Sequence, residues 1–287
     1  MEIFISIVSD ALIDTLKLLP FLFVTYLAME ALEHKAGGKA QAAIRRAGTS
    51  GPAIGAVLGV FPQCGFSAAA ATLYAGRVIT LGTLFAVFLS TSDEMLPIFI
   101  AEQVDVSVIL KILAMKLVIG LIMGFVVDAA LRFSRRAGDN KMHIHELCQQ
   151  EHCACEEGIF KSACKHTLQV TLFIFLFSLA IGGFVAWVGE EAIASFMAAQ
   201  PLLSVFASAL VGLIPNCAAS VVITELYLAG TLGAGAMMAG LLVSAGVGLL
   251  VLFRTNRNLR ENLVILLVLY FIGVAWGLII TALGIRF

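Results

Sequence analysis

The chain has 287 residues, of which 60% are hydrophobic and 13% are charged, and its formal net charge is −1. An ordinary soluble domain is about 45–50% apolar and about 25% charged, so this composition excludes a soluble globular fold and indicates a protein of the lipid bilayer. The balanced charge offers no basic surface to a nucleic acid, and no nucleic-acid partner is expected.

Five helical segments are predicted in the first half of the chain, and two of them are short apolar arms. The arms are separated at Pro62-Gln63-Cys64, because proline removes a backbone donor and breaks a helix. An arm of about 12 residues reaches about 18 Å, less than a hydrocarbon core of about 30 Å, so we expect the arms to re-enter, with two full crossings as the open alternative. The segments are a long helix over 10–33 followed by a basic amphipathic piece over 35–49, the arms over 50–61 and 65–76, and full-length helices over 79–100 and 107–132.

The second half of the chain repeats the first. The segment GVFPQCGFSAAAATLYAGRVITLG at 59–82 aligns without a gap with GLIPNCAASVVITELYLAGTLGAG at 212–235, at an offset of 215 − 62 = 153 residues. The repeat predicts further segments over 159–188, 201–214, 218–229, 232–253 and 261–284. It divides the chain into a first transmembrane repeat (1–133), a His/Cys-rich linker (134–165) and a second repeat (166–287).

The second copy is expected to be inverted. Three and five crossings per copy are both odd numbers, and Lys and Arg gather in the loops that the inversion places in the cytoplasm. The loops at 101–107 and 189–200, expected outside, contain no Lys or Arg. The predicted fold is an all-α integral membrane protein of two inverted-topology repeats, each with five helical segments and a broken, re-entrant hairpin. Both termini are predicted outside, and the 134–165 linker in the cytoplasm.

The two Pro-x-Cys breaks are the candidate binding site. Irregular backbone at membrane depth is tolerated only inside the protein or along a wet cavity, and at matching positions of inverted repeats it indicates a substrate site. A lone cysteine in a membrane helix is ordinarily a packing residue, but the same motif at both tips, each with an amide, favours binding. The predicted substrate-binding residues are Pro62, Gln63, Cys64 and Ser67 in the first copy and Pro215, Asn216, Cys217 and Ser220 in the second.

Ionisable residues inside the predicted spans are the candidates for coupling. Each costs about 2.5–3.5 kcal/mol to insert, so such residues usually mark a pathway or a proton relay. Asp93 and Glu94 interrupt an apolar stretch and point about 100° apart on a helix. We expect Asp93 to face the site and Glu94 to carry protons or to pair structurally. Glu225 supplies a third carboxylate in the second copy, and Lys116 is expected to pair with Asp93 or Glu94.

The linker between the copies concentrates imidazole and thiol groups. Together these ligands select soft or borderline ions such as zinc, copper or nickel, although their spacing fits no closed zinc finger. Metal capture or sensing is therefore predicted, with a solvated linker as the alternative. The candidate ligands are His143, His145, Cys148, His152, Cys153 and Cys155.

The stretches FPQCGFSAAAATLYAGRVITLGTLFAVFLSTSDE and LIPNCAASVVITELYLAG resemble those of the ArsP-like permeases, specifically the ten-helix heavy-metal exporters. The resemblance covers essentially the whole chain, including the linker. It implies export of a metal or metalloid across the cytoplasmic membrane of a prokaryote, since members are described as arsenic efflux proteins or manganese transporters. Trivalent arsenic is thiophilic, so the resemblance also implies a direct role for Cys64 and Cys217.

The predicted function is secondary active, proton-coupled efflux of a heavy metal or an arsenic-type metalloid. The pattern G-x-x-x-x-G-K-[ST] is absent, so ATP coupling within the chain is disfavoured, and no cofactor is expected. Transport of manganese or another hard divalent ion through the carboxylates is one alternative. A metal-responsive membrane receptor is the other, and an enzyme is disfavoured because the spans offer no nucleophile–base pair. The expected partners are the ion and the bilayer, and homo-oligomerisation stays open.

Overall fold

The computed structural model describes the chain from residue 50 onward, with gaps at 62–63, 93–94, 134–158 and 189–200, and isolated helical turns between residues 8 and 27. Every regular element in these ranges is a helix. The predicted 35–49 piece and most of the 134–165 linker lie outside the described residues. The all-α prediction is therefore confirmed for the part of the chain that the structure describes.

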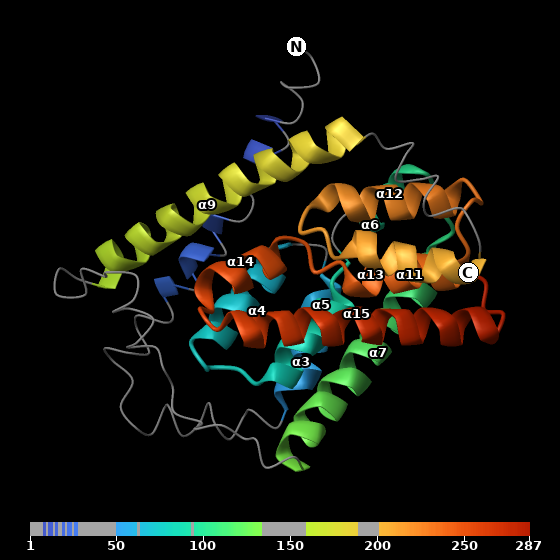
Figure 1. The fold of residues 1–287 in the computed structure, drawn as a ribbon, viewed down its shortest axis with the longest axis horizontal. Coiled ribbons are helices and arrows are strands. Elements are labelled where there is room, and N and C mark those ends of the chain that lie inside the picture. Colours follow the sequence, from blue (N-terminus) through green and yellow to red (C-terminus); the bar gives the residue numbers. More distant parts are fainter. Residues whose placement is uncertain are drawn as a thin grey trace.

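The helices follow one another close to the predicted places (Figure 1). They are α3 (Gly51–Val60), α4 (Cys64–Ala75), α5 (Leu81–Ser90), α6 (Met95–Ala101), α7 (Val106–Phe133), α9 (Ile159–Val188), α11 (Pro201–Gly212), α12 (Cys217–Leu228), α13 (Ala234–Val243), α14 (Val247–Thr255) and α15 (Leu259–Ala282). Both predicted pairs of short arms are present, as α3 with α4 and as α11 with α12. Five described stretches are long and apolar enough to cross a membrane, namely Leu81–Ala101, Val106–Phe133, Ala163–Ala180, Ala234–Thr255 and Leu259–Ala282.

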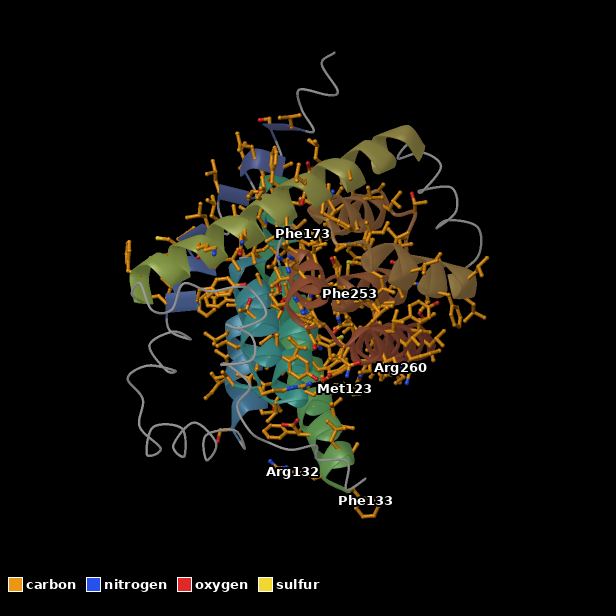
Figure 2. The ribbon with its side chains drawn as sticks, turned by 60° about the vertical axis from the view of Figure 1, so that its left-hand side comes forward. Met123, Arg132, Phe133, Phe173, Phe253 and Arg260 are labelled. Atoms are coloured by element: carbon orange, nitrogen blue, oxygen red, sulfur yellow. The ribbon has the colours of Figure 1, made fainter. Side chains whose placement is uncertain are left out.

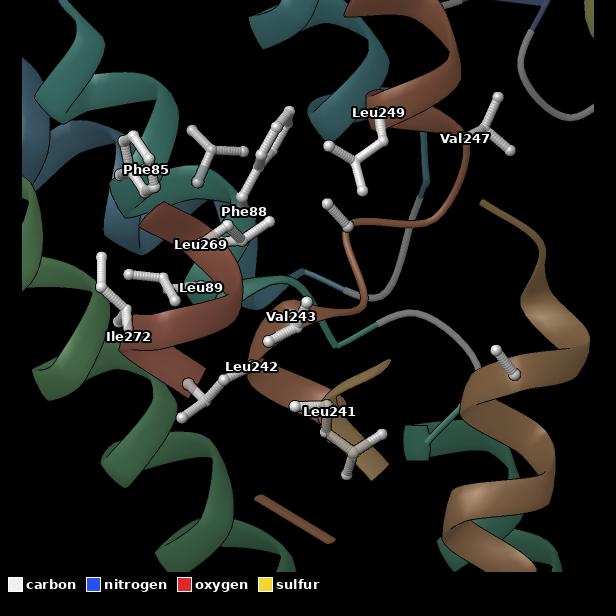
Figure 3. Close-up of a cluster of buried hydrophobic side chains, with 14 of the residues drawn as sticks. Phe85, Phe88, Leu89, Leu241, Leu242, Val243, Val247, Leu249, Leu269 and Ile272 are labelled. Carbon is white, nitrogen blue, oxygen red and sulfur yellow. The ribbon is translucent and has the colours of Figure 1, made fainter. Parts of the chain in front are cut away.

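Helices α5 and α13 form the centre of the molecule. Every residue from Gly82 to Ser90 and from Gly235 to Val243 is buried. Helix α5 packs against α3 and α7, and α13 packs against α11 and α15. Figure 3 shows Phe88 of α5, Leu242 of α13 and Leu269 of α15 in one apolar cluster. Helices α7 and α15 bury one face and leave large apolar side chains exposed on the other, as helices that border lipid do.

The two halves pack their helices through equivalent glycine contacts. Gly82 of α5 lies against the Gly124 carbonyl of α7, and Gly235 of α13 lies against the Gly277 carbonyl of α15. The offsets 235 − 82 and 277 − 124 are both 153, the spacing of the sequence repeat. A Cβ atom at Gly82 or Gly235 would collide with these carbonyls, so glycine is what permits the close approach of the two backbones. The duplicated sequence thus builds the same helix packing twice.

Two further helices are interrupted at equivalent positions, and here the prediction of continuous helices over 79–100 and 232–253 was wrong. Helix α5 ends at Ser90 and α6 starts only at Met95, while α13 ends at Val243 and α14 starts at Val247. Pro97 lies in the first turn of α6, where a missing amide donor is tolerated. In the second half Gly246, the N-cap of α14, has a φ of 52°, which L side chains rarely adopt, so glycine suits the turn between α13 and α14.

Helix α9 lies along the outside of the other helices, beside the first segment (Figure 1). The ring of Phe160 meets that of Phe23 edge to face, with centroids 5.5 Å apart. The guanidinium of Arg254, at the end of α14, lies 5.7 Å from the ring centroid of Phe173 on α9. Figure 2 shows Phe173 and Phe253 on the side where α9 and α14 pack together. Helix α9, the first helix of the second half, is therefore in contact with α14 of the same half through a cation–π interaction.

Asp128 of α7 caps the first turn of α5. Its buried carboxylate accepts hydrogen bonds from the Gly82 amide at 2.8 Å and from the Thr80 hydroxyl at 2.7 Å. We expect Asp128→Ala to lower the free energy of unfolding by about 1–3 kcal/mol, because a buried amide and hydroxyl lose their acceptor. The melting temperature of the protein purified in detergent measures this. The exposed Glu102→Ala should melt as the wild type does, and an equal melting temperature for Asp128→Ala would contradict the cap.

Candidate functional site

Each Pro-x-Cys motif ends one short helix and starts the next. Helix α4 begins at Cys64 and α12 at Cys217, so the first amides of both helices lack acceptors within the helix. Asn216 is the N-cap of α12, and its side-chain oxygen accepts from the Ala218 amide at 3.3 Å. The positive end of each helix dipole therefore faces a break. Outside the described part of the chain lie Pro62, Gln63 and the side chains of Cys64 and Cys217.

The first Pro-x-Cys break lies beside an interrupted helix of the other half. Ser67, one turn after Cys64, is fully buried and packs against Gly248 in the first turn of α14. A Cβ atom on Gly248 would lie 2.7 Å from the Ser67 Cβ, so glycine lets α4 and α14 touch. Helix α12 packs in turn on α6. The arm that follows each Pro-x-Cys motif, α4 or α12, therefore contacts the second piece of the broken helix from the opposite half.

Lys116 of α7 joins the two interrupted helices. Its ammonium donates to the Thr91 carbonyl at the end of α5 and to the Leu241 carbonyl in the last turn of α13, the latter at 2.9 Å. The Lys116 side chain is 1% exposed, so these contacts lie deep inside the protein. Figure 3 shows the extended stretch between Val243 and Val247 that separates α13 from α14. Interrupted backbone from both halves thus meets at one buried ammonium group.

The predicted coupling residues are only partly described. Asp93 and Glu94 fall between α5 and α6 and lie outside the described residues, so their expected pairing with Lys116 stays a prediction. Glu225 is exposed on α12, whereas Ser220 on the same helix is buried. Pro215, before the start of α12, is half-buried.

The predicted metal ligands of the linker, residues 143–155, also lie outside the described residues. Within the part of the chain that is described, no three His, Cys, Asp or Glu side chains come together as a metal site. Cys164, near the start of α9, is exposed and is not in a disulfide. Metal binding by the linker therefore stays a prediction.

Sequence reasoning missed the interruption of the second half and the carbonyl partners of Lys116. A signal for the interruption was present, because Ser244-Ala245-Gly246 aligns with Thr91-Ser92-Asp93 at the repeat offset. The charged residue Asp93 interrupts the first apolar stretch, so the alignment predicts an interruption of the second stretch, where Gly246 stands in its place. No comparable signal identifies Leu241, because its carbonyl is a backbone atom that any residue would supply.

Equivalent turns of the two halves lie at opposite ends of α15. Arg77, after α4, forms hydrogen bonds of 2.7 Å with each carboxylate oxygen of Glu261 in the first turn of α15, and the Tyr74 hydroxyl donates to the same carboxylate. The hydrogen bond with Glu261 raises the pKa of the Arg77 guanidinium above its usual value. At the far end of the helix, the Tyr227 hydroxyl donates to the Phe287 carbonyl at 3.3 Å. Tyr74 and Tyr227 are equivalent residues, 153 positions apart.

The fold and the site define a multi-pass helical membrane protein with interrupted helices in its interior, an architecture typical of secondary transporters. The chain belongs to the ArsP_2 family, described as "Putative, 10TM heavy-metal exporter", whose sequence model matches residues 1–185. The resemblance to this family is thereby confirmed over residues 1–185, which include the first Pro-x-Cys stretch, and it stays a prediction for the second stretch. No curated protein and no solved structure matches the chain.

Proposed function

We propose that the chain is a secondary active transporter that exports a thiophilic heavy metal or metalloid ion of the arsenic type in exchange for protons. The observation that carries this proposal is the position of the Pro-x-Cys motifs. Both stand at the interruption of a pair of short apolar helices, and the helix that starts at Cys64 packs against the broken helix of the other half. Membership in a heavy-metal exporter family supports the same function.

The donor groups at the two interruptions suit a soft ion. Thiolates bind thiophilic ions in preference to Mg²⁺, Ca²⁺ or Mn²⁺, and the starts of α4 and α12 add amides that favour an anionic or polarised ligand. Carboxyl groups inside a membrane protein can alternate between protonated and ionised forms as protons pass. The proposed substrate residues are Pro62, Gln63, Cys64, Ser67, Pro215, Asn216, Cys217 and Ser220, and the proposed proton carriers are Asp93, Glu94 and Glu225.

The proposal includes two inverted repeats of five helical segments each. Equivalent glycines make equivalent helix contacts in both halves, and the equivalent residues Tyr74 and Tyr227 lie at opposite ends of α15. The family description gives ten transmembrane helices, which is twice five. In this topology both termini lie outside and the 134–165 linker faces the cytoplasm of a prokaryotic cell, where the Lys- and Arg-rich loops belong.

Ion uptake into inverted membrane vesicles tests the proposal. Vesicles with and without the protein are given arsenite, antimonite, cadmium, zinc or manganese, with a proton gradient that is imposed and then collapsed by a protonophore. We expect uptake of a thiophilic ion that requires the gradient. Uptake of manganese alone would replace the soft substrate with a hard one. Uptake of no ion, with metal tolerance of the cells retained, would instead favour a metal-responsive receptor.

One observation favours manganese as the second candidate substrate. Asp93 and Glu94 fall at the interruption between α5 and α6, and carboxylate and carbonyl oxygens are the ligands that Mn²⁺ prefers. In that case Asp93→Asn abolishes manganese uptake in the same vesicles, while serine at both cysteine positions leaves it unchanged.

A further inference from the structure

Lys116 is a charged side chain in the middle of the long apolar helix α7, and the mechanism proposed above does not use it. A lysine at the centre of a membrane helix costs about 2.5–3.5 kcal/mol to insert, so its charge must be offset by the protein around it. Its two carbonyl partners come from different halves of the chain, Thr91 on α5 and Leu241 on α13. The ammonium therefore links the two halves of the chain by hydrogen bonds, close to the points where α5 and α13 end.

The broken helices contribute negative potential at this ammonium through the Thr91 and Leu241 carbonyls. The Ala245 amide, which a continuous helix would direct to Leu241, donates to the Val243 carbonyl instead, so the Leu241 carbonyl is available to Lys116. Each helix C-terminus carries about half a negative charge, so the ends of α5 and α13 both attract the ammonium.

A single lysine serves both breaks. The residue equivalent to Lys116 in the second copy, 153 positions later, is Leu269, which is apolar and fully buried. The site is therefore asymmetric although the interruptions are symmetric. Gly120, one turn after Lys116, packs against the Ala86 carbonyl and brings α7 close enough for the lysine to reach between α5 and α13.

We propose that the Lys116 ammonium is a built-in cation that occupies the place of a coupling sodium ion. In transporters built from inverted repeats, unwound carbonyls and the C-terminal ends of half-helices coordinate sodium. Here the same kind of oxygen set binds an ammonium that belongs to the chain. The consequence for transport rests on the proposed function: if the chain is a transporter, its transport should not require sodium. Occupancy of the site by a cation is testable without any transport.

The decisive variant is Lys116→Ala, which removes the ammonium and leaves room for a small cation. Protein purified in detergent is melted in choline chloride and in sodium, lithium or potassium chloride at equal ionic strength. We expect the wild type to melt at one temperature in all four salts. Lys116→Ala should melt lower in choline and recover by several degrees in sodium or lithium. If the variant stays folded during detergent extraction only when sodium is present, this also shows that sodium stabilises it.

Two matched variants control for packing and for charge. Lys116→Met fills the space with an apolar chain and should show no response to sodium, and Lys111→Ala, an exposed lysine of the same helix, should behave as the wild type. A Lys116→Ala protein that melts equally in every salt, or is recovered in none, overturns the inference. So does a wild type whose melting temperature or ion uptake depends on sodium. Because melting needs no transported ion, failure of the export proposal in vesicles would leave this result standing.

Discussion

Cells that express Cys64→Ser together with Cys217→Ser are expected to lose the arsenite tolerance that the wild-type chain confers. Serine is nearly the same size as cysteine and is accepted at a helix start, so α4 and α12 should still begin at these positions. A hydroxyl does not form the thiolate that a soft ion requires. Growth at increasing arsenite concentrations measures the loss, and vesicle uptake of arsenite should fall to the level of vesicles without the protein.

The single variants show whether both thiols bind the same ion. If they act as one site, each single change should remove most of the uptake, because residues that act as a unit are not additive. Cys164→Ser is the matched control, since Cys164 is exposed on α9 and lies outside the proposed site. All variants are compared at equal membrane content of protein. Tolerance that is unchanged in the double variant would reject the thiol site.

The sequence predicted the helices well, because their determinants are local. Short apolar runs with a proline at each tip define α3, α4, α11 and α12 within one or two residues. The internal repeat added what hydropathy lacks, namely which helices are equivalent, and the paired contacts of Gly82 and Gly235 follow the same offset. A property carried by neighbouring residues, or by a duplicated pattern, can be read along the chain.

The breaks in 79–100 and 232–253 were harder to predict because their cost is offset by distant residues. Thr91 and Leu241 lose helical partners and gain the ammonium of Lys116, which comes from a third helix. Hydropathy cannot reveal that a lysine reaches two backbone oxygens. The cost of burying Lys116 indicated only that it has partners, and its predicted pairing with Asp93 or Glu94 stays a prediction. The pairing of Arg77 with Glu261 could not be predicted for the same reason, because the two residues are 184 positions apart in the sequence.

Arg77 occupies a position where the backbone alone would favour glycine. Its φ is 57°, and the equivalent residue of the second copy is Gly230, with a φ of 73°. Both turns close in the same way, since the amides of Val78 and Thr231 donate back to the preceding helix at 2.9 and 3.0 Å. A left-handed conformation costs a residue with a Cβ about 1–2 kcal/mol. Arginine persists here because its side chain holds the α4–α5 turn to Glu261 at the start of α15.

Reversing this charge is expected to destabilise the protein more than removing it. Arg77→Glu places two carboxylates together in a half-buried contact and should lower the free energy of unfolding by about 2–4 kcal/mol, near the values for a broken buried pair. Arg77→Gly loses the pair but relieves the backbone, so its loss should be smaller. Combining Arg77→Glu with Glu261→Arg should restore part of the melting temperature, because opposite charges face each other again. If Arg77→Glu melts no lower than Arg77→Gly, the ion pair does not hold the two halves together, and the turn is stabilised by its backbone hydrogen bonds.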